Sequence, residues 1–166
     1  PNRVVTFQLR GYFPTGDGRE GLGTEHYSIE PSILFLQQLS ENIILEGEIR
    51  DWISIGGSDF AGNVLRYGLG LGVLAYNSCN LRIIPIVEFV GWTFLDGMFF
   101  DGTAGVIGDA TGDTIVNVKG GVRIGFGALE GQGLLSATDL GISYGRALTG
   151  DVLYTDIARV ELRMRY

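Results

Sequence analysis

The last eight residues of the chain alternate strictly between charged and apolar side chains. Arg159, Glu161, Arg163 and Arg165 alternate with Val160, Leu162, Met164 and Tyr166. A helix would spread the four charges around its surface, whereas a strand places them on one face and the apolar groups on the other. The pattern therefore predicts a β-strand with one polar and one apolar face.

The same alternation recurs upstream and predicts eight strands in all. They span residues Arg3–Phe13, Thr24–Gln38, Asn42–Ile55, Gly62–Tyr76, Asn80–Leu95, Asp113–Gly127, Ser136–Leu148 and Leu153–Tyr166. Most exceed the usual globular strand of about 5–6 residues and reach the roughly 9–11 residues that a tilted strand needs to cross a bilayer. The chain is therefore predicted to be all-β, a single transmembrane antiparallel up-and-down β-barrel of about 8 strands over residues 1–166.

The predicted connections differ in length in the way that bacterial outer-membrane barrels require. Ser40–Glu41 and Asn77–Ser78 form short turns, while Pro14–Gly23, Gly56–Ala61 and Asp96–Gly112 are longer and rich in Gly, Asp and Thr. Outer-membrane barrels have short periplasmic turns and long extracellular loops. Two connections depart from this pattern, because Ala128–Gln132 is longer than a short turn and Thr149–Val152 is shorter than a long loop. The even strand count predicts that both ends of the chain lie on the short-turn side, which would be the periplasm.

Parity along the strands assigns most charged side chains to the barrel interior. A charge on the lipid face costs about 2–4 kcal/mol at the bilayer midplane, and buried charges persist when they are paired. We predict an interior charge network of Glu30, Glu46, Glu48, Arg50, Arg66, Arg82, Glu88, Lys119, Arg123, Arg159, Glu161 and Arg163. Asp51 is an exception on the outward face. A barrel of eight strands is filled by its own side chains, so no open pore is expected for that size.

Aromatic residues fall near the predicted strand ends. Those near the long loops are Tyr27, Trp52, Trp92, Phe94 and Tyr154, and those near the short turns are Phe35, Tyr76, Phe126 and Tyr166. Two such groups are typical of the aromatic girdles at membrane interfaces. The alternative is ordinary core aromatics of a soluble β protein.

Composition excludes several functional classes. The net charge of −7 argues against nucleic acid, which needs a basic surface. The single cysteine, Cys79, cannot form an internal disulfide, and no apolar run is long enough for a transmembrane helix. Glycine, at 27 of 166 residues, is about twice as common as usual and favours strands that curve sharply.

Several motifs resemble one outer-membrane family. They are Gly11–Asp17, Gly21–Thr24, Ile29–Pro31, Glu46–Glu48 and Asp59–Asn63. The chain resembles the family named for the MetA pathway of phenol degradation and its transporter relatives. The resemblance implies an outer-membrane location, passage of small and often hydrophobic compounds, and no catalytic residues. Barrels of this family are expected to have about 12 strands, so this chain would be either a compact relative or part of a longer barrel.

The C-terminal residue also resembles a family feature. Tyr166 is similar to the terminal aromatic residue that the barrel-assembly machinery reads. The expected partners are therefore this machinery and outer-membrane lipid, with a homo-oligomer as a further candidate. No cofactor or metal is expected.

Two alternatives to a non-enzymatic outer-membrane barrel stay open. His26, Ser28 and Glu30 share a strand face, as a His-x-Ser pair with a carboxylate does in outer-membrane lipid A deacylases, so a lipid-modifying enzyme is one alternative. Strand neighbours two residues apart usually lie too far apart for a nucleophile and its base. A soluble lipocalin-like ligand-binding barrel is another alternative, but such barrels place apolar groups inside.

Two glycine-rich segments have chemical interpretations that we weigh against simpler ones. Asp96, Asp101, Asp109 and Asp113 could supply oxygen ligands for Ca²⁺, but they lack an EF-hand spacing, so an acidic solvated loop is favoured. The glycines of residues 68–72 alternate within one strand, whereas a nucleotide fingerprint requires a strand-to-helix turn.

Overall fold

The computed structural model describes residues 2–16, 25–101, 106–126, 138–149 and 154–164 and contains a strand in each predicted segment. The eight long strands are β1 (Arg3–Tyr12), β2 (Tyr27–Gln38), β3 (Ile43–Ile55), β4 (Val64–Val73), β6 (Leu81–Phe94), β9 (Thr114–Phe126), β10 (Thr138–Ala147) and β11 (Asp156–Met164). Three short strands are β5 (Tyr76–Asn77), β7 (Met98–Asp101) and β8 (Val106–Asp109). The prediction of an all-β chain is confirmed for these residues.

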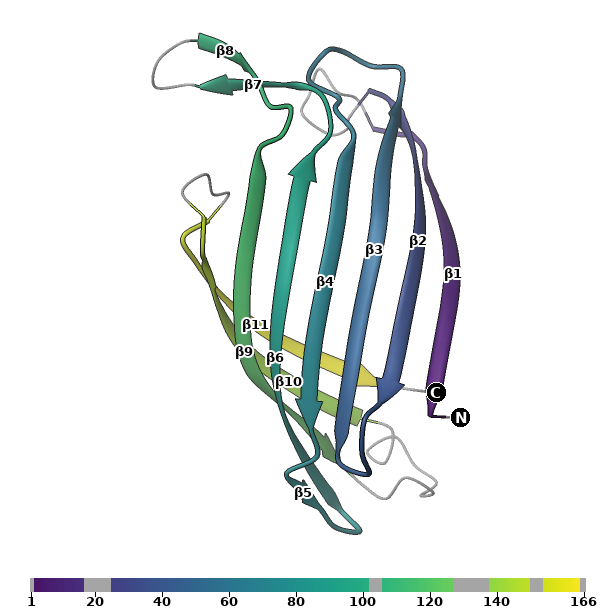
Figure 1. Ribbon diagram of the computed structural model, residues 1–166, viewed down its shortest axis with the longest axis vertical. Coiled ribbons are helices and arrows are strands. Elements are labelled where there is room, and N and C mark those ends of the chain that lie inside the picture. The colour runs from purple at the N-terminus through teal and green to yellow at the C-terminus, as the bar shows by residue number, and fades with distance from the viewer. Residues whose placement is uncertain (1, 17–24, 102–105, 127–137, 150–153, 165–166) are drawn as a thin grey trace.

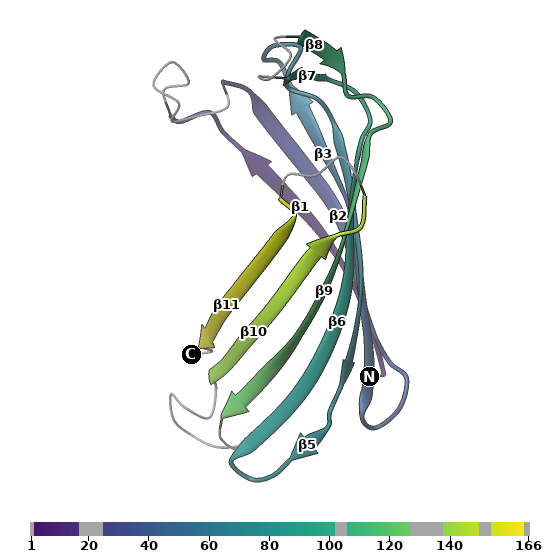
Figure 2. The ribbon, with the colours of Figure 1, turned by 90° about the vertical axis from the view of Figure 1, so that its left-hand side faces the viewer.

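The long strands form one antiparallel meander (Figure 1). Each strand pairs with the next long strand along the chain, in the order β1-β2-β3-β4-β6-β9-β10-β11, and β5 adds to β6. Neighbouring antiparallel strands can be joined at one end of the sheet, here by a short turn such as residues 39–42 or by a longer loop such as residues 56–63. The ends of β1 and β11 that lead to the chain termini lie at the same end of the sheet (Figures 1 and 2).

The sheet is curled but does not close into a barrel. Figure 2 shows β10 and β11 folded round toward β1 so that the sheet encloses a concave face. No strand pairs with the free edge of β1 or of β11 in the described part of the chain. The closed barrel expected from the sequence is therefore absent from this structure, and the shape is an open, curved sheet.

The pairing is strongly staggered. Each residue of a strand lies opposite one residue of the next strand. A line drawn through these pairs from Val5, near the start of β1, crosses all eight strands and ends at Asp156, the first residue of β11. Val5 lies near the short-turn end of the sheet and Asp156 near the long-loop end. A stagger of this kind tilts the strands relative to the axis of curvature, as closed barrels require.

Two elements differ from the sequence prediction. The predicted strand over residues 62–76 ends at Val73, and the chain then forms the short strand β5. The predicted loop Asp96–Gly112 contains a separate hairpin of β7 and β8. Gly97, with a φ of 107°, starts this hairpin in a conformation that favours glycine. The run Met98–Phe100 lacks the alternation that indicated the other strands.

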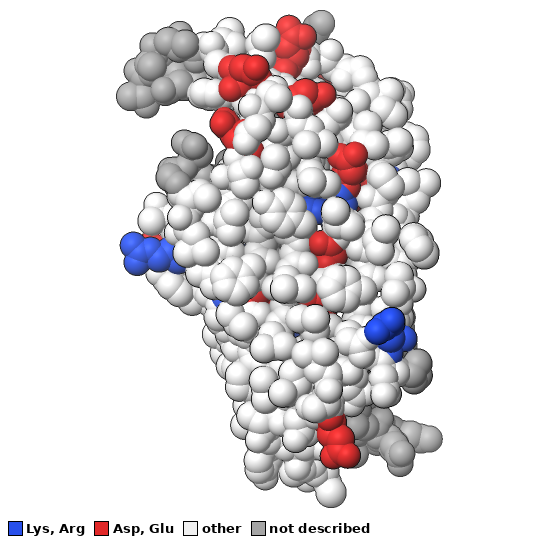
Figure 3. Space-filling view, viewed as in Figure 1, with Lys and Arg blue, Asp and Glu red and all other residues white. Residues whose placement is uncertain are grey.

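The convex face exposes large apolar side chains. On the strand nearest one edge, Phe7 is 78% and Leu9 73% exposed, and Val160 on the opposite edge strand is 72% exposed. Most of the convex face is uncharged, with carboxylates gathered at the long-loop end and isolated charged groups elsewhere on the face (Figure 3). The described residues include no helix that is long and apolar enough to cross a membrane.

The most buried side chains are mainly polar. Only Ala110 and Ile115 are buried apolar residues in the described ranges. The buried polar residues are Ser28, Glu30, Ser32, Asn117, Thr138 and Asp139. This distribution is the reverse of a water-soluble domain, in which apolar groups fill the core.

Candidate functional site

The most buried charge of the concave face is Glu30, whose carboxylate is held by three arginines. Arg50 lies 3.1 Å, Arg10 3.3 Å and Arg66 3.5 Å from the Glu30 carboxylate oxygens. Arg10 is the residue directly opposite Glu30 on β1, and Arg66 lies opposite Arg50 on β4. Glu30 is 0% exposed, so this ion-paired geometry compensates for loss of its hydration.

Two further contacts extend this cluster along the sheet. Arg50 also donates to Glu48 at 2.5 and 2.9 Å. The Arg66 guanidinium lies 5.0 Å from the ring centre of Trp52, a cation–π distance. The Trp52 ring in turn contacts Tyr12, with ring centres 4.4 Å apart. We call Tyr12, Glu30, Arg10, Arg50, Arg66, Glu48 and Trp52 the Glu30 cluster.

A second group of ion pairs lies on β6, β10 and β11. Arg82 pairs with Asp139 at 3.6 Å, and Arg159 pairs with Glu161 at 2.9 Å. Arg163 also bonds to Glu161. Gly125 leaves space for the first pair, because a β-carbon there would lie 2.8 Å from Asp139 and 2.9 Å from Arg82. Small residues on neighbouring strands thus make room for the long charged side chains.

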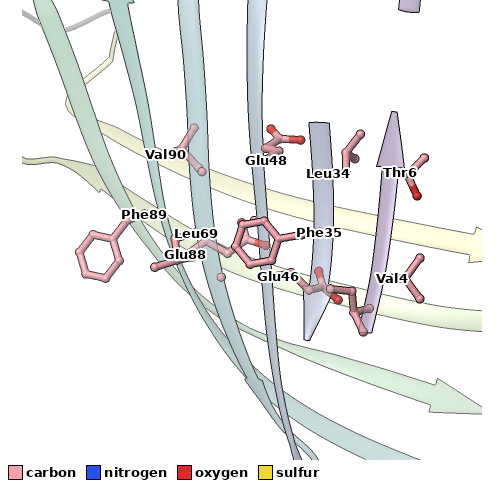
Figure 4. A pocket seen from close by; sticks show the side chains of 14 residues that line it. Val4, Thr6, Leu34, Phe35, Glu46, Glu48, Leu69, Glu88, Phe89 and Val90 are labelled. Atoms are coloured by element: carbon pink, nitrogen blue, oxygen red, sulfur yellow. The ribbon is translucent and has the colours of Figure 1, made fainter. Parts of the chain in front are cut away.

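A cavity of 480 Å³ lies between these two groups on the concave face. Glu46 and Glu48 from β3 and Glu88 from β6 line it, together with Leu34 from β2 (Figure 4). The intervening strand β4 contributes glycines, and Gly70 lies directly between Glu46 and Glu88 in the register. The glycines leave room for the neighbouring glutamates, because a β-carbon at Gly68 would lie 3.5 Å from Cγ of Glu48 and one at Gly70 would lie 3.4 Å from Cγ of Glu88.

The predicted interior charges are therefore distributed over three places. Glu30, Glu48, Arg50 and Arg66 come together in the Glu30 cluster, while Glu46 and Glu88 line the cavity. Lys119 lies opposite Glu88 on β9. Arg123 lines a smaller cavity of 80 Å³ with residues of the second group, Arg159, Glu161 and Arg163. Arg82 pairs with Asp139.

The prediction did not include Asp139 or the ring contact of Tyr12 in the network. Asp139 has inward parity in a predicted strand that also contains Gly141, Ser143 and Gly145, so a stricter use of alternation could have identified it. The packing of Tyr12 on Trp52 had no signal in the sequence, because it depends on the pairing of β1 and β3 with the strand between them.

Part of the predicted long-loop aromatic girdle is wrong. Trp52 and Phe94 line a cavity of 540 Å³ at the long-loop end, with Phe60, Phe99 and Arg66, instead of covering the convex face. Their inward parity, shared with Arg50 and Arg66, explains this position. Tyr27, Phe35 and Tyr76 are exposed, as girdle residues would be.

Asp51 lies on the convex face, as its parity predicts. It lines a shallow depression of 630 Å³ with Leu9, Pro31 and Ile49. Among the described residues its Oδ1 atom is buried without a hydrogen-bond partner. Pro31 lacks an N–H group, and the regular ladder between β2 and β3 is interrupted beside it.

The structure does not assemble the candidate serine site. Ser28 is 2% exposed, and its Oγ has no hydrogen-bond partner in the described part of the chain, so no base is positioned to activate it. Glu30 is occupied by three arginines. His26 lines the long-loop cavity.

The candidate calcium ligands are engaged in loop structure. Asp96 accepts hydrogen bonds from the backbone and side chain of Asn63. The Asp109 carboxylate accepts a bond of 2.8 Å from the backbone of Thr111, and hydrogen bonds with Thr111 lower the pKa of Asp109. The described residues contain no group of three or more metal-binding side chains.

The proposed assembly signal Tyr166 lies outside the described residues. Comparison of the whole chain with protein-family models, curated proteins and solved structures finds no match. The family resemblance of the sequence motifs therefore stays a prediction.

Proposed function

We propose that the chain is an integral outer-membrane β-barrel without enzymatic activity, which serves the passage of small solutes. The observation that carries the proposal is the reversed burial of the sheet, with Phe7, Leu9 and Val160 exposed and Glu30 fully buried. Lipid favours apolar side chains on the outside of a barrel, while charged groups are tolerated inside when they are paired. The stagger from Val5 to Asp156 supports a tilted barrel wall.

Solute passage is supported by the space on the concave face. The cavity of 480 Å³ is lined by Glu46, Glu48 and Glu88, and polar walls of this kind suit hydrated solutes. The resemblance to transporter relatives extends the candidate solutes to small hydrophobic compounds. The location is proposed to be the bacterial outer membrane, with outer-membrane lipid and the barrel-assembly machinery as partners.

A role in membrane architecture is the second candidate. The Glu30 cluster occupies the concave side of four neighbouring strands with three arginines and a tryptophan. Side chains of this size can fill a narrow barrel. A filled lumen would leave the protein a structural component of the membrane.

Two measurements on the refolded full chain test the proposal. Flotation with phospholipid vesicles after a carbonate wash should place the protein in the lipid fraction, whereas a protein that stays in the aqueous fraction without detergent would contradict membrane insertion. Single-channel recording in a planar bilayer then separates the two roles. Stable unitary steps support solute passage, and silence from verifiably inserted protein favours architecture.

A further inference from the structure

We infer that the free edges of β1 and β11 pair with each other and that the register of this seam places Glu161 opposite Arg10. The inference rests on the membrane insertion in the proposed function and not on solute passage, because an open sheet edge in lipid would leave backbone N–H and C=O groups without partners. Both edges are free in the described part of the chain. Closing them against each other would satisfy these groups and convert the curved sheet into a barrel.

The directions and ends of the two strands suit this pairing. The eight long strands alternate in direction, so β1 and β11 are antiparallel. The start of β1 and the end of β11 lie at the same end of the sheet (Figure 2). Because the accumulated stagger runs from Val5 to Asp156, closure of the sheet pairs Asp156 with a residue further along β1 than Val5. In the register that we infer, residues 159–164 of β11 lie level with residues 7–12 of β1.

Side-chain parity restricts the seam to registers that differ by two residues. A slip by one residue would turn the apolar face of one strand toward the charged face of the other. In the register that we infer, Met164 lies opposite Phe7 and Leu162 opposite Leu9. All four side chains are on the convex face and are at least half exposed in the open sheet.

Charge distinguishes this register from its two neighbours. A slip of two residues in one direction places Arg159 opposite Arg10, and a slip in the other direction places Arg163 there. Like charges directly opposite each other destabilise a strand pair. Only the middle register gives Arg10 a carboxylate, that of Glu161.

The groups at the seam can make this ion pair. The Arg10 side chain is 43% exposed and Glu161 27%, so neither is enclosed by the open sheet. Glu161 already binds two arginines, Arg159 and Arg163. Glu30 in the same sheet binds three arginines, so this protein already contains one carboxylate with as many arginine partners as Glu161 would have after the seam forms.

Disulfide trapping tests the register. In a background carrying Cys79→Ser, Leu9→Cys would be combined with Leu162→Cys, and in matched controls with Val160→Cys or Met164→Cys. Directly opposite residues have Cα atoms about 4.5–5.5 Å apart, within the range for a disulfide, while diagonal neighbours lie about 7–8 Å apart. The protein would be inserted into vesicles, verified by flotation, and oxidised.

The expected result is an intramolecular disulfide that forms at least tenfold faster in the Leu9/Leu162 pair than in either control pair. Faster trapping of a control pair would overturn the register. Disulfide-linked dimers would show that a second copy closes the seam, and inserted protein with no disulfide in any pair would show that other strands do. Each of these results refutes the seam but leaves membrane insertion standing, whereas failed flotation refutes the proposed function as well.

A double-mutant cycle gives an independent readout. Arg10→Gln and Glu161→Gln, made singly and together, remove the seam ion pair from either side, while the contacts of Arg10 with Glu30 and of Glu161 with Arg159 and Arg163 are lost equally in the single and double variants and cancel in the cycle. Each single substitution should slow trapping of the Leu9/Leu162 pair, and the double variant should trap faster than the product of the two single effects predicts. Strictly multiplicative effects would show that this ion pair does not set the register.

Discussion

Glu30 is the residue on which the concave charge network depends most. Its carboxylate is the shared partner of Arg10, Arg50 and Arg66 and has no exposed surface. Removal of one member of a buried ion pair leaves its partners uncompensated, at a cost of about 3–5 kcal/mol. Glu30→Gln, which keeps the shape of the side chain, is therefore expected to lower the free energy of unfolding by about 3 kcal/mol.

The matched control for this prediction is Glu46→Gln. Glu46 is another concave glutamate, but it is exposed and faces the cavity, so its replacement should change stability by less than about 0.5 kcal/mol. Guanidinium unfolding of both variants in detergent, followed by tryptophan fluorescence, gives the comparison. Equal effects of the two substitutions would show that the Glu30 cluster contributes no more than a surface charge.

Two adjacent glycines of β9 give a second comparison. A β-carbon at Gly121 would lie 2.6 Å from the carbonyl oxygen of Ile142 on β10, whereas one at Gly120 would meet nothing within 4 Å. Gly121→Ala should therefore force β9 and β10 apart and destabilise the protein by about 1–3 kcal/mol, with Gly120→Ala within about 0.5 kcal/mol of the parent. Thermal unfolding in detergent measures both, and a harmless Gly121→Ala would contradict the close strand approach.

The long strands could be predicted from the sequence because the alternation of polar and apolar residues that indicates a strand lies within the strand itself. In β11, Arg159, Glu161 and Arg163 alternate with apolar residues, and this alternation depends on nothing outside the strand. The same parity placed Glu30, Arg50 and Arg66 on one face, and in the structure Arg50 and Arg66 both pair with Glu30. Alternation also placed Trp52 inside, so the idea that it belongs to an outer girdle conflicted with evidence already in the sequence.

The remaining features depend on contacts between distant segments. The hairpin of β7 and β8 lacks alternation and is fixed by packing of the loop, as in the hydrogen bond from Ala110 to Gly97. The partner of Arg82 is Asp139, which is far away in the sequence and reaches it across β9. Closure of the sheet depends on the curvature and the stagger summed over eight strands. These sums cannot be read from the sequence of any single strand.

The molecule as a whole combines an apolar convex face with a charged concave one, and this combination bears on the alternative of a soluble lipocalin-like barrel. Such a barrel places apolar side chains around its ligand and polar groups outside. Here Phe7, Leu9 and Leu162 lie on the outside, while Glu30 and Asp139 are buried. In water the convex face would be an extended aggregation-prone surface, and in a bilayer it would contact lipid.

The single cysteine of the chain provides a test of orientation. Cys79 is exposed in the turn between β5 and β6, at the short-turn end, which we predict to face the periplasm. In bacteria that export the protein, a membrane-impermeant maleimide should label Cys79 only after the outer membrane is permeabilised. In a Cys79→Ser background, Ser58→Cys in the opposite loop should be labelled in intact cells. Labelling of Cys79 but not of the Ser58→Cys variant in intact cells would reverse the orientation, and equal labelling of both before permeabilisation would place neither end behind a membrane.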